Sequence, residues 1–172
     1  MITAVTILGL PAHPLIVHGA VVGIPLAALA MLYYAAFPKY REIAWWPVAI
    51  TVAAAYLFSI LAGSTGEELQ HALKHSSYIE DHAKWAGYLG AAMHVFAPAS
   101  LVWLVVDRLR RTRESSGEPV ADWMLKLRMV AIPVSLVAAV VALSLVGIVG
   151  HLGAKAAWHE SPAASAKVRA GG

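Results

Sequence analysis

Four long stretches without a charged side chain dominate the sequence. No Asp, Glu, Lys or Arg occurs in residues 15–37, 44–63, 85–106 or 129–150. Each stretch is close to the roughly 20 residues that an α-helix needs to cross the hydrocarbon core of a bilayer. Only 13% of the 172 residues are charged, whereas about 25% is usual in a soluble domain. The sequence therefore predicts an all-α integral membrane protein, an antiparallel bundle of four transmembrane helices.

The connections between the four spans predict a single domain. A tight turn around residues 37–41 joins the first two spans, and a polar segment containing Gly117 and Pro119 interrupts the helix between the last two. Residues 66–75 are expected to form a short separate helix after the second span. We expect residues 1–160 to form the transmembrane domain and residues 161–172, rich in Ala, Gly and Ser, to be a disordered tail.

The distribution of basic residues predicts the orientation in the membrane. Cytoplasmic loops of membrane proteins carry an excess of Lys and Arg near the ends of the spans. Two loops, after spans one and three, carry Lys39, Arg41, Arg108, Arg110, Arg111, Arg113, Lys126 and Arg128. The other side has fewer basic residues, and they are mixed with acidic ones. Both termini are therefore expected on the outer side.

Several classes of chemistry are disfavoured by what the sequence lacks. It contains no cysteine, so it forms no disulfide, holds no iron–sulfur cluster through thiolates and attaches no c-type haem covalently. Nucleophile and metalloprotease motifs such as G-x-S-x-G and H-E-x-x-H do not occur. The basic residues flank the spans, so the expected partner is the lipid bilayer and not nucleic acid. An electron carrier or accessory subunit is favoured over an enzyme.

Histidine is the residue type that most suggests a functional site. The expected topology places seven of the eight histidines near the outer side, namely His13, His18, His71, His75, His82, His151 and His159. The eighth, His94, lies roughly 13 Å into the third span at 1.5 Å per residue. An ionisable side chain inside a span is by default a functional candidate.

Imidazoles gathered at one membrane surface are compatible with three functions. Two histidines on different helices can hold a b-type haem for electron transfer. Copper or zinc also binds imidazole, and His71 and His75 have the i, i+4 spacing that allows two rings to converge, with Glu67 or Glu68 nearby. In the third reading the chain is an accessory or structural subunit of a membrane complex and binds no cofactor.

Several short motifs resemble a known family. They are Gly9-Leu10-Pro11-Ala12-His13-Pro14-Leu15-Ile16-Val17-His18, then Pro25-Leu26-Ala27, Gly66-Glu67-Glu68-Leu69, His82, Gly150-His151-Leu152-Gly153-Ala154 and Trp158. The chain is similar over nearly its whole length to the bacterial domain-of-unknown-function family 2231, and most of all to actinobacterial members. The resemblance implies a four-span protein of the bacterial cytoplasmic membrane. Some relatives carry the domain beside redox modules such as Rieske-type domains, which suggests electron transfer.

The resemblance also selects among the candidate residues. It points to His13, His18, Glu67, His82 and His151, whereas His71, His75 and His94 do not match the pattern. The sequence hypothesis is a haem b site with His18 and His82 as axial ligands and His151 as the substitute for either, with His13 and His94 as further candidates. In the copper or zinc alternative the ligands are His13, His18, His82, His151 and Glu67. A respiratory or other redox membrane complex and a second copy of the chain are the possible protein partners.

Overall fold

Four long helices make up almost all of the structure. The computed structural model describes residues 6–7, 10–72 and 76–159. The helices are α1 (Ala12–Ala36), α2 (Arg41–Ala72), α3 (Ser77–Ser115) and α4 (Asp122–His159), and a single 3₁₀ turn, η1 (Pro38–Tyr40), joins α1 to α2. Two short strands, β1 (Thr6–Ile7) and β2 (Leu10–Pro11), pair antiparallel just before α1. The expected tail, residues 161–172, lies outside the described residues, as does His75.

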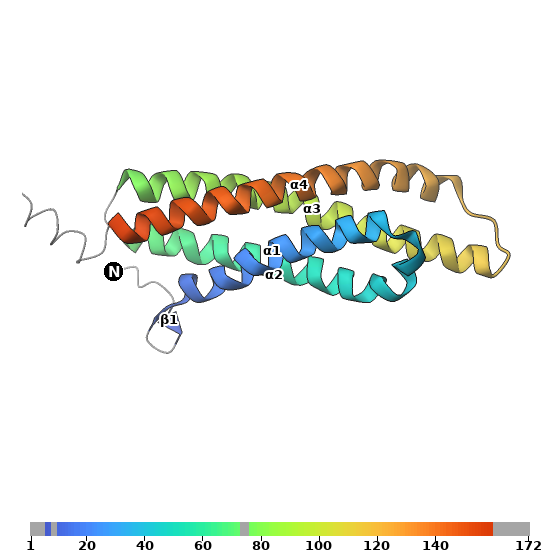
Figure 1. The fold of residues 1–172 in the computed structure, drawn as a ribbon, viewed down its shortest axis with the longest axis horizontal. Helices are drawn as coiled ribbons and strands as arrows, with labels where there is room; N and C mark the ends of the chain where they lie inside the picture. Colours follow the sequence, from blue (N-terminus) through green and yellow to red (C-terminus); the bar gives the residue numbers. More distant parts are fainter. Residues whose placement is uncertain (1–5, 8–9, 73–75, 160–172) are drawn as a thin grey trace, which may run out of the picture.

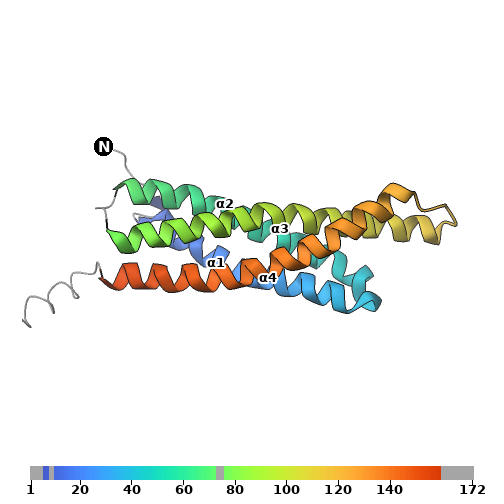
Figure 2. The same ribbon diagram turned by 90° about the horizontal axis from the view of Figure 1, so that it is seen from above.

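The helices run side by side and alternate in direction (Figure 1, Figure 2). α1 packs mainly against α2, and α3 mainly against α4. We call the end where α1 begins and α4 ends the histidine end, and the end with the α1–α2 and α3–α4 connections the arginine end. All four helices are long and apolar enough to cross a membrane. The predicted antiparallel bundle of four transmembrane helices is confirmed, and its orientation in the membrane stays a prediction.

The helix boundaries differ from the expected spans in three ways. α2, α3 and α4 extend beyond their charge-free stretches at both ends, α1 only at its start, and α3 and α4 reach past the α1–α2 connection at the arginine end (Figure 1). Residues 66–72 form the last turns of α2, so the expected separate helix is continuous with the span. The β1–β2 pair was not anticipated. The predicted break between α3 and α4 is present, and Gly117 there has a positive φ of 71°.

Small residues fill the centre of the bundle. The buried positions are rich in alanine, and the largest fully buried side chains include Met31, Tyr34, Phe96 and Trp103. Small residues let helix backbones approach closely, which is how helices associate where lipid removes the hydrophobic driving force. Many large apolar side chains point outward instead, Ile43 being 80% exposed and Met129 73%. A surface of this kind is suited to contact with acyl chains.

Specific contacts fix how neighbouring helices face each other. Gly19 of α1 leaves room for the Phe58 ring of α2, because a Cβ at position 19 would lie 2.5 Å from Cδ1 of Phe58. The buried hydroxyl groups of Ser100 in α3 and Ser135 in α4 are 2.7 Å apart and share a hydrogen bond. These contacts hold α1 against α2 and α3 against α4.

Candidate functional sites at the two ends of the bundle

His13 lies in the first turn of α1 and contacts the last third of α2. Its Nδ1 atom is 3.3 Å from the hydroxyl oxygen of Thr65. Because that hydroxyl donates its own proton to the carbonyl of Leu61 at 2.7 Å, it accepts the proton of His13 Nδ1. Gly66 makes this approach possible, since a Cβ at that position would lie 3.0 Å from Cε1 of the His13 ring.

His82 makes the matching contact between α3 and α4. Its Nδ1 atom donates to the carbonyl oxygen of Val149 at 3.1 Å. In a helix the side chain at i+4 lies over the carbonyl at i, and here that position is Gly153. A Cβ there would come within 3.0 Å of Cε1 of His82. Gly153, the second glycine of the Gly150–Ala154 motif, therefore leaves the carbonyl of Val149 accessible to the imidazole.

His13, near the start of α1, and His82, near the start of α3, both lie at the histidine end. Both rings are partly buried, and they are close enough for a charge on one to act on the other. Each ring uses Nδ1 as a hydrogen-bond donor, so the neutral tautomer of each has its lone pair on Nε2. A donating Nδ1 held by an oxygen acceptor is the usual outer-shell arrangement of a histidine that ligates a metal through Nε2.

The other histidine candidates lie on exposed surfaces. Within the described residues, the rings of His18, His71 and His94 each donate from Nδ1 to the carbonyl four residues earlier in their own helix. The ring of His94 also meets Tyr56 of α2 edge-on, with ring centroids 5.4 Å apart. His151 is exposed near the end of α4, and the side chain of His159 is not described. The structure therefore does not gather these residues around the His13–His82 pair.

Carboxylates at the histidine end do not complete a multidentate metal site. Glu67 is exposed, whereas Glu68 is partly buried and its Oε2 atom has no hydrogen-bond partner among the described residues. Within the part of the chain that the structure describes, no three His, Cys, Asp or Glu side chains are placed to hold a metal ion. The ligand set expected for copper or zinc is therefore not assembled among these residues.

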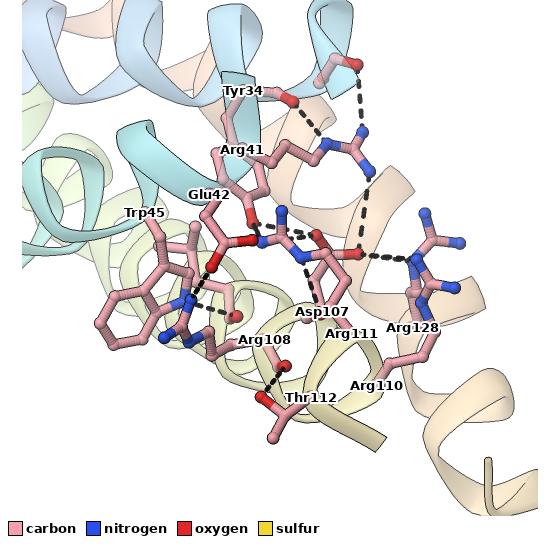
Figure 3. A network of polar contacts seen from close by, with 12 residues as sticks. Tyr34, Arg41, Glu42, Trp45, Asp107, Arg108, Arg110, Arg111, Thr112 and Arg128 are labelled. Atoms are coloured by element: carbon pink, nitrogen blue, oxygen red, sulfur yellow. Dashed lines mark hydrogen bonds and ion pairs between the residues drawn. The ribbon is translucent and has the colours of Figure 1, made fainter. Parts of the chain in front are cut away.

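A second polar site lies at the arginine end and is centred on Asp107 of α3 (Figure 3). The Asp107 side chain is completely buried. The phenol of Tyr34 donates to its Oδ2 at 2.9 Å, and Arg111 lies 3.3 Å from the same oxygen. Arg128 of α4 donates from Nε to Oδ1 at 3.2 Å. One carboxylate thus links α1, α3 and α4.

Two more arginines surround the same carboxylate. Arg41, at the start of α2, lies 3.7 Å from Oδ1 and donates to the carbonyl of Tyr34 at 2.9 Å. Its guanidinium group also lies against the rings of Tyr34 and Trp103. Arg110 is 4.0 Å from Oδ1 and is paired with Glu114 one turn later. All four helices contribute a side chain to this site, which we call the Asp107 cluster: Tyr34, Arg41, Asp107, Arg110, Arg111 and Arg128.

The Asp107 cluster was missed in the sequence because its arginines were interpreted only as topology signals. One signal was available. Asp107 is the first charged residue after the third charge-free stretch, and Arg110 and Arg111 follow at i+3 and i+4, where side chains on a helix meet. An acid at the edge of a span, followed at this spacing by two bases, indicates a paired buried carboxylate.

Comparison with known proteins gives the family. The model of a family described as "Predicted membrane protein (DUF2231)" matches residues 9–164. The chain belongs to this family. No curated protein and no solved structure matches the chain. The DUF2231 match covers all four helices and both end sites, and it includes Gly66, His82 and Gly153, which carried the resemblance in the sequence.

Proposed function

We propose that this multi-pass membrane protein binds a b-type haem at its histidine end, with His13 and His82 as the axial ligands, and transfers electrons to or from a partner on that side of the membrane. The observation that carries the proposal is the His13–His82 pair. Two imidazoles from different helices lie near enough for their charges to interact, and Nδ1 of each donates a hydrogen bond, so Nε2 has the lone pair. Bis-imidazole ligation is suited to electron transfer, because no iron position is left open for a substrate.

The number of available ligands favours haem over a bare metal ion. A structural zinc site needs about four protein ligands and a catalytic one about three. The described residues provide a pair and not a group of three. The porphyrin itself supplies the remaining donors of a haem iron, so two histidines suffice. Copper or zinc is therefore the alternative that metal analysis must test.

His13 replaces His18 in our proposal as the partner of His82. His13 is partly buried and faces α2, with its ring against Gly66. His18 is exposed, and its Nδ1 is bonded to the carbonyl of Pro14 within its own helix. A ligand that faces a neighbouring helix is better held against a flat macrocycle than one on the lipid-facing surface.

Spectroscopy of the purified protein tests this proposal directly. The protein would be isolated in mild detergent from cells supplied with haem precursor, and its reduced-minus-oxidised visible spectrum recorded together with its iron, copper and zinc content. We expect sharp Soret and α bands with about one iron per chain. The variants H13A and H82A should each lose at least about 90% of the bound haem. Loss of an outer-shell partner of a metal ligand already costs about 10- to 100-fold in affinity, and loss of the ligand itself should cost at least as much.

His71→Ala serves as the matched control. His71 lies at the same end but is exposed, and its Nδ1 donates to the carbonyl of Glu67 within its own helix, so H71A should keep the full spectrum. A spectrum unchanged in both H13A and H82A would overturn the ligand assignment. A spectrum without haem bands, from a sample that contains copper or zinc, would favour a metal-handling protein. A sample without any metal would favour an accessory subunit that binds no cofactor.

A further inference from the structure

We propose that the Asp107 cluster is a binding site for the phosphate group of an anionic phospholipid. Four guanidinium groups meet there, and within the described part of the chain only two carboxylates, Asp107 and Glu114, are paired with them. Two positive charges therefore remain without a counter-charge from the residues that the structure describes. Arginine recognises phosphate oxygens well, because its planar group donates two parallel hydrogen bonds.

Several donors of the cluster are unused. Among the described residues, Arg128 makes one hydrogen bond, from Nε to Asp107, so both its terminal nitrogens have none. The Nε atom of Arg110 is buried and has no hydrogen-bond partner in the described ranges either. Arg110 and Arg128 both reach Oδ1 of Asp107, and Figure 3 draws their guanidinium groups next to each other. An anion held between these two groups would satisfy donors that the protein leaves open.

The guanidinium groups are reachable from outside the bundle. The side chain of Asp107 is 0% exposed, but those of Arg110 and Arg128 are 24% and 28% exposed. Asp107 therefore fixes the arginines from within, and their outer edges remain open to a ligand. Because side chains held this way lose little freedom on binding, the site is preorganised for an anion.

The depth of the cluster identifies the source of the phosphate. Asp107 directly follows the charge-free stretch 85–106, and Arg128 directly precedes the stretch 129–150. The cluster thus lies where hydrocarbon gives way to headgroups, and Trp45 and Trp123 mark the same level, as an aromatic belt does. Basic pockets between transmembrane helices at this level bind lipid headgroups. A lipid phosphate is present there at high local concentration, whereas a free ion is not.

Native mass spectrometry of the full chain in detergent tests the proposal. Phosphatidylglycerol and phosphatidylcholine of identical acyl chains are titrated separately, and the bound lipid is counted. We expect selective retention of one phosphatidylglycerol. R128Q should weaken it at least about ten-fold, because the lost contact is a hydrogen bond to a charged group. R110Q should also weaken retention, by about five-fold or more. Loss of the Arg110 guanidinium group disturbs Asp107 least, because it lies 4.0 Å from Oδ1.

Lys126→Gln is the charge-matched control. Lys126 is exposed at the same end and is not part of the cluster, so K126Q should weaken retention less than about five-fold. Equal losses in K126Q and R128Q would mean a diffuse surface effect and would overturn the site. Equal retention of the two lipids, or competition by millimolar inorganic phosphate that removes the bound lipid, would overturn the lipid as its ligand.

Discussion

At the scale of single residues, Asp107 shows how much one buried charge can organise. Its carboxylate meets Tyr34 from α1, Arg41 from α2, Arg111 from its own helix and Arg128 from α4. Removing one member of a buried ion pair typically costs about 3–5 kcal/mol, because the partner charge is left uncompensated. The arginines are partly exposed, so part of that penalty is relieved by solvent and headgroups. The lower end of the range applies here.

We predict that Asp107→Asn lowers the free energy of unfolding by about 3 kcal/mol. The substitution keeps the shape of the side chain and removes its charge, so four guanidinium groups lose their shared counter-ion. Unfolding in mixed detergent micelles, followed by circular dichroism, measures the change.

Glu42→Gln is the appropriate comparison for D107N. Glu42 is paired with Arg108 at 2.8 Å, but both side chains are well exposed. An exposed ion pair is worth less than about 1 kcal/mol, so E42Q should be nearly neutral. Equal destabilisation by the two changes would show that Asp107 does not organise the arginine end.

The sequence predicted part of the histidine end at this scale. The family resemblance selected His13 and His82 together with His18, Glu67 and His151, and the structure places His13 and His82 near enough for their charges to interact. The sequence hypothesis named His18 as the partner of His82. Because His13 and His18 both lie at the start of one helix, the direction of each ring depends on its packing against α2, which the sequence does not contain. Gly66 and Gly153 were part of the resemblance, but their role as openings for the two imidazoles requires the neighbouring helix to be placed.

At the scale of helices, the α1–α2 pair depends on a missing side chain. Gly19 faces the ring of Phe58, and a Cβ at position 19 would overlap its atoms Cγ, Cδ1 and Cε1. Phe58 is 38% exposed, so its ring has some room to move toward lipid. By contrast, a Cβ at Gly23, one turn later, would make ordinary contact with Ala55 at 3.5 Å.

We predict that Gly19→Ala lowers the free energy of unfolding by about 1–3 kcal/mol, the usual cost of overpacking a close helix contact. In the background of Phe58→Ala the same change should cost under about 0.5 kcal/mol, since the overlap is gone. The same micelle titration applied to the four chains measures this coupling.

Gly23→Ala provides the internal control for this contact. It adds the same methyl group to the same helix, where space exists, and should be close to neutral. A cost of Gly19→Ala that persists without the Phe58 ring would contradict a steric origin.

At the scale of the whole molecule, the charge-free stretches determine most of the architecture. Hydrocarbon tolerates neither charges nor unpaired backbone groups, so four such stretches with polar connections predict four antiparallel helices. Helix ends were less predictable, because residues 66–72 lie beyond the hydrocarbon, where both a continuous and a broken helix satisfy the backbone. The Asp107 cluster depends on side chains from all four helices, and no local pattern contains them together.

Orientation can be tested because the chain contains no cysteine. We predict that Ser77→Cys, at the histidine end, reacts with a membrane-impermeant maleimide in intact cells, and that Thr112→Cys, at the arginine end, reacts only after the cells are opened. Both positions are exposed, so the reagent reaches either thiol once it is on the correct side. The reverse labelling would place the arginine end outside and contradict the positive-inside assignment.

The start of α1 and the end of α4 lie at the same end of the bundle, and this arrangement determines where fused domains would lie. A domain joined before α1 or after α4 is delivered to the same face of the membrane, because these two helix ends lie at the same end of the bundle (Figure 2). Neither linker has to cross the bilayer, and short tethers raise the effective concentration of the attached domain to the millimolar range. The four-helix unit can therefore serve as an anchor that keeps a water-soluble module within reach of its imidazole pair.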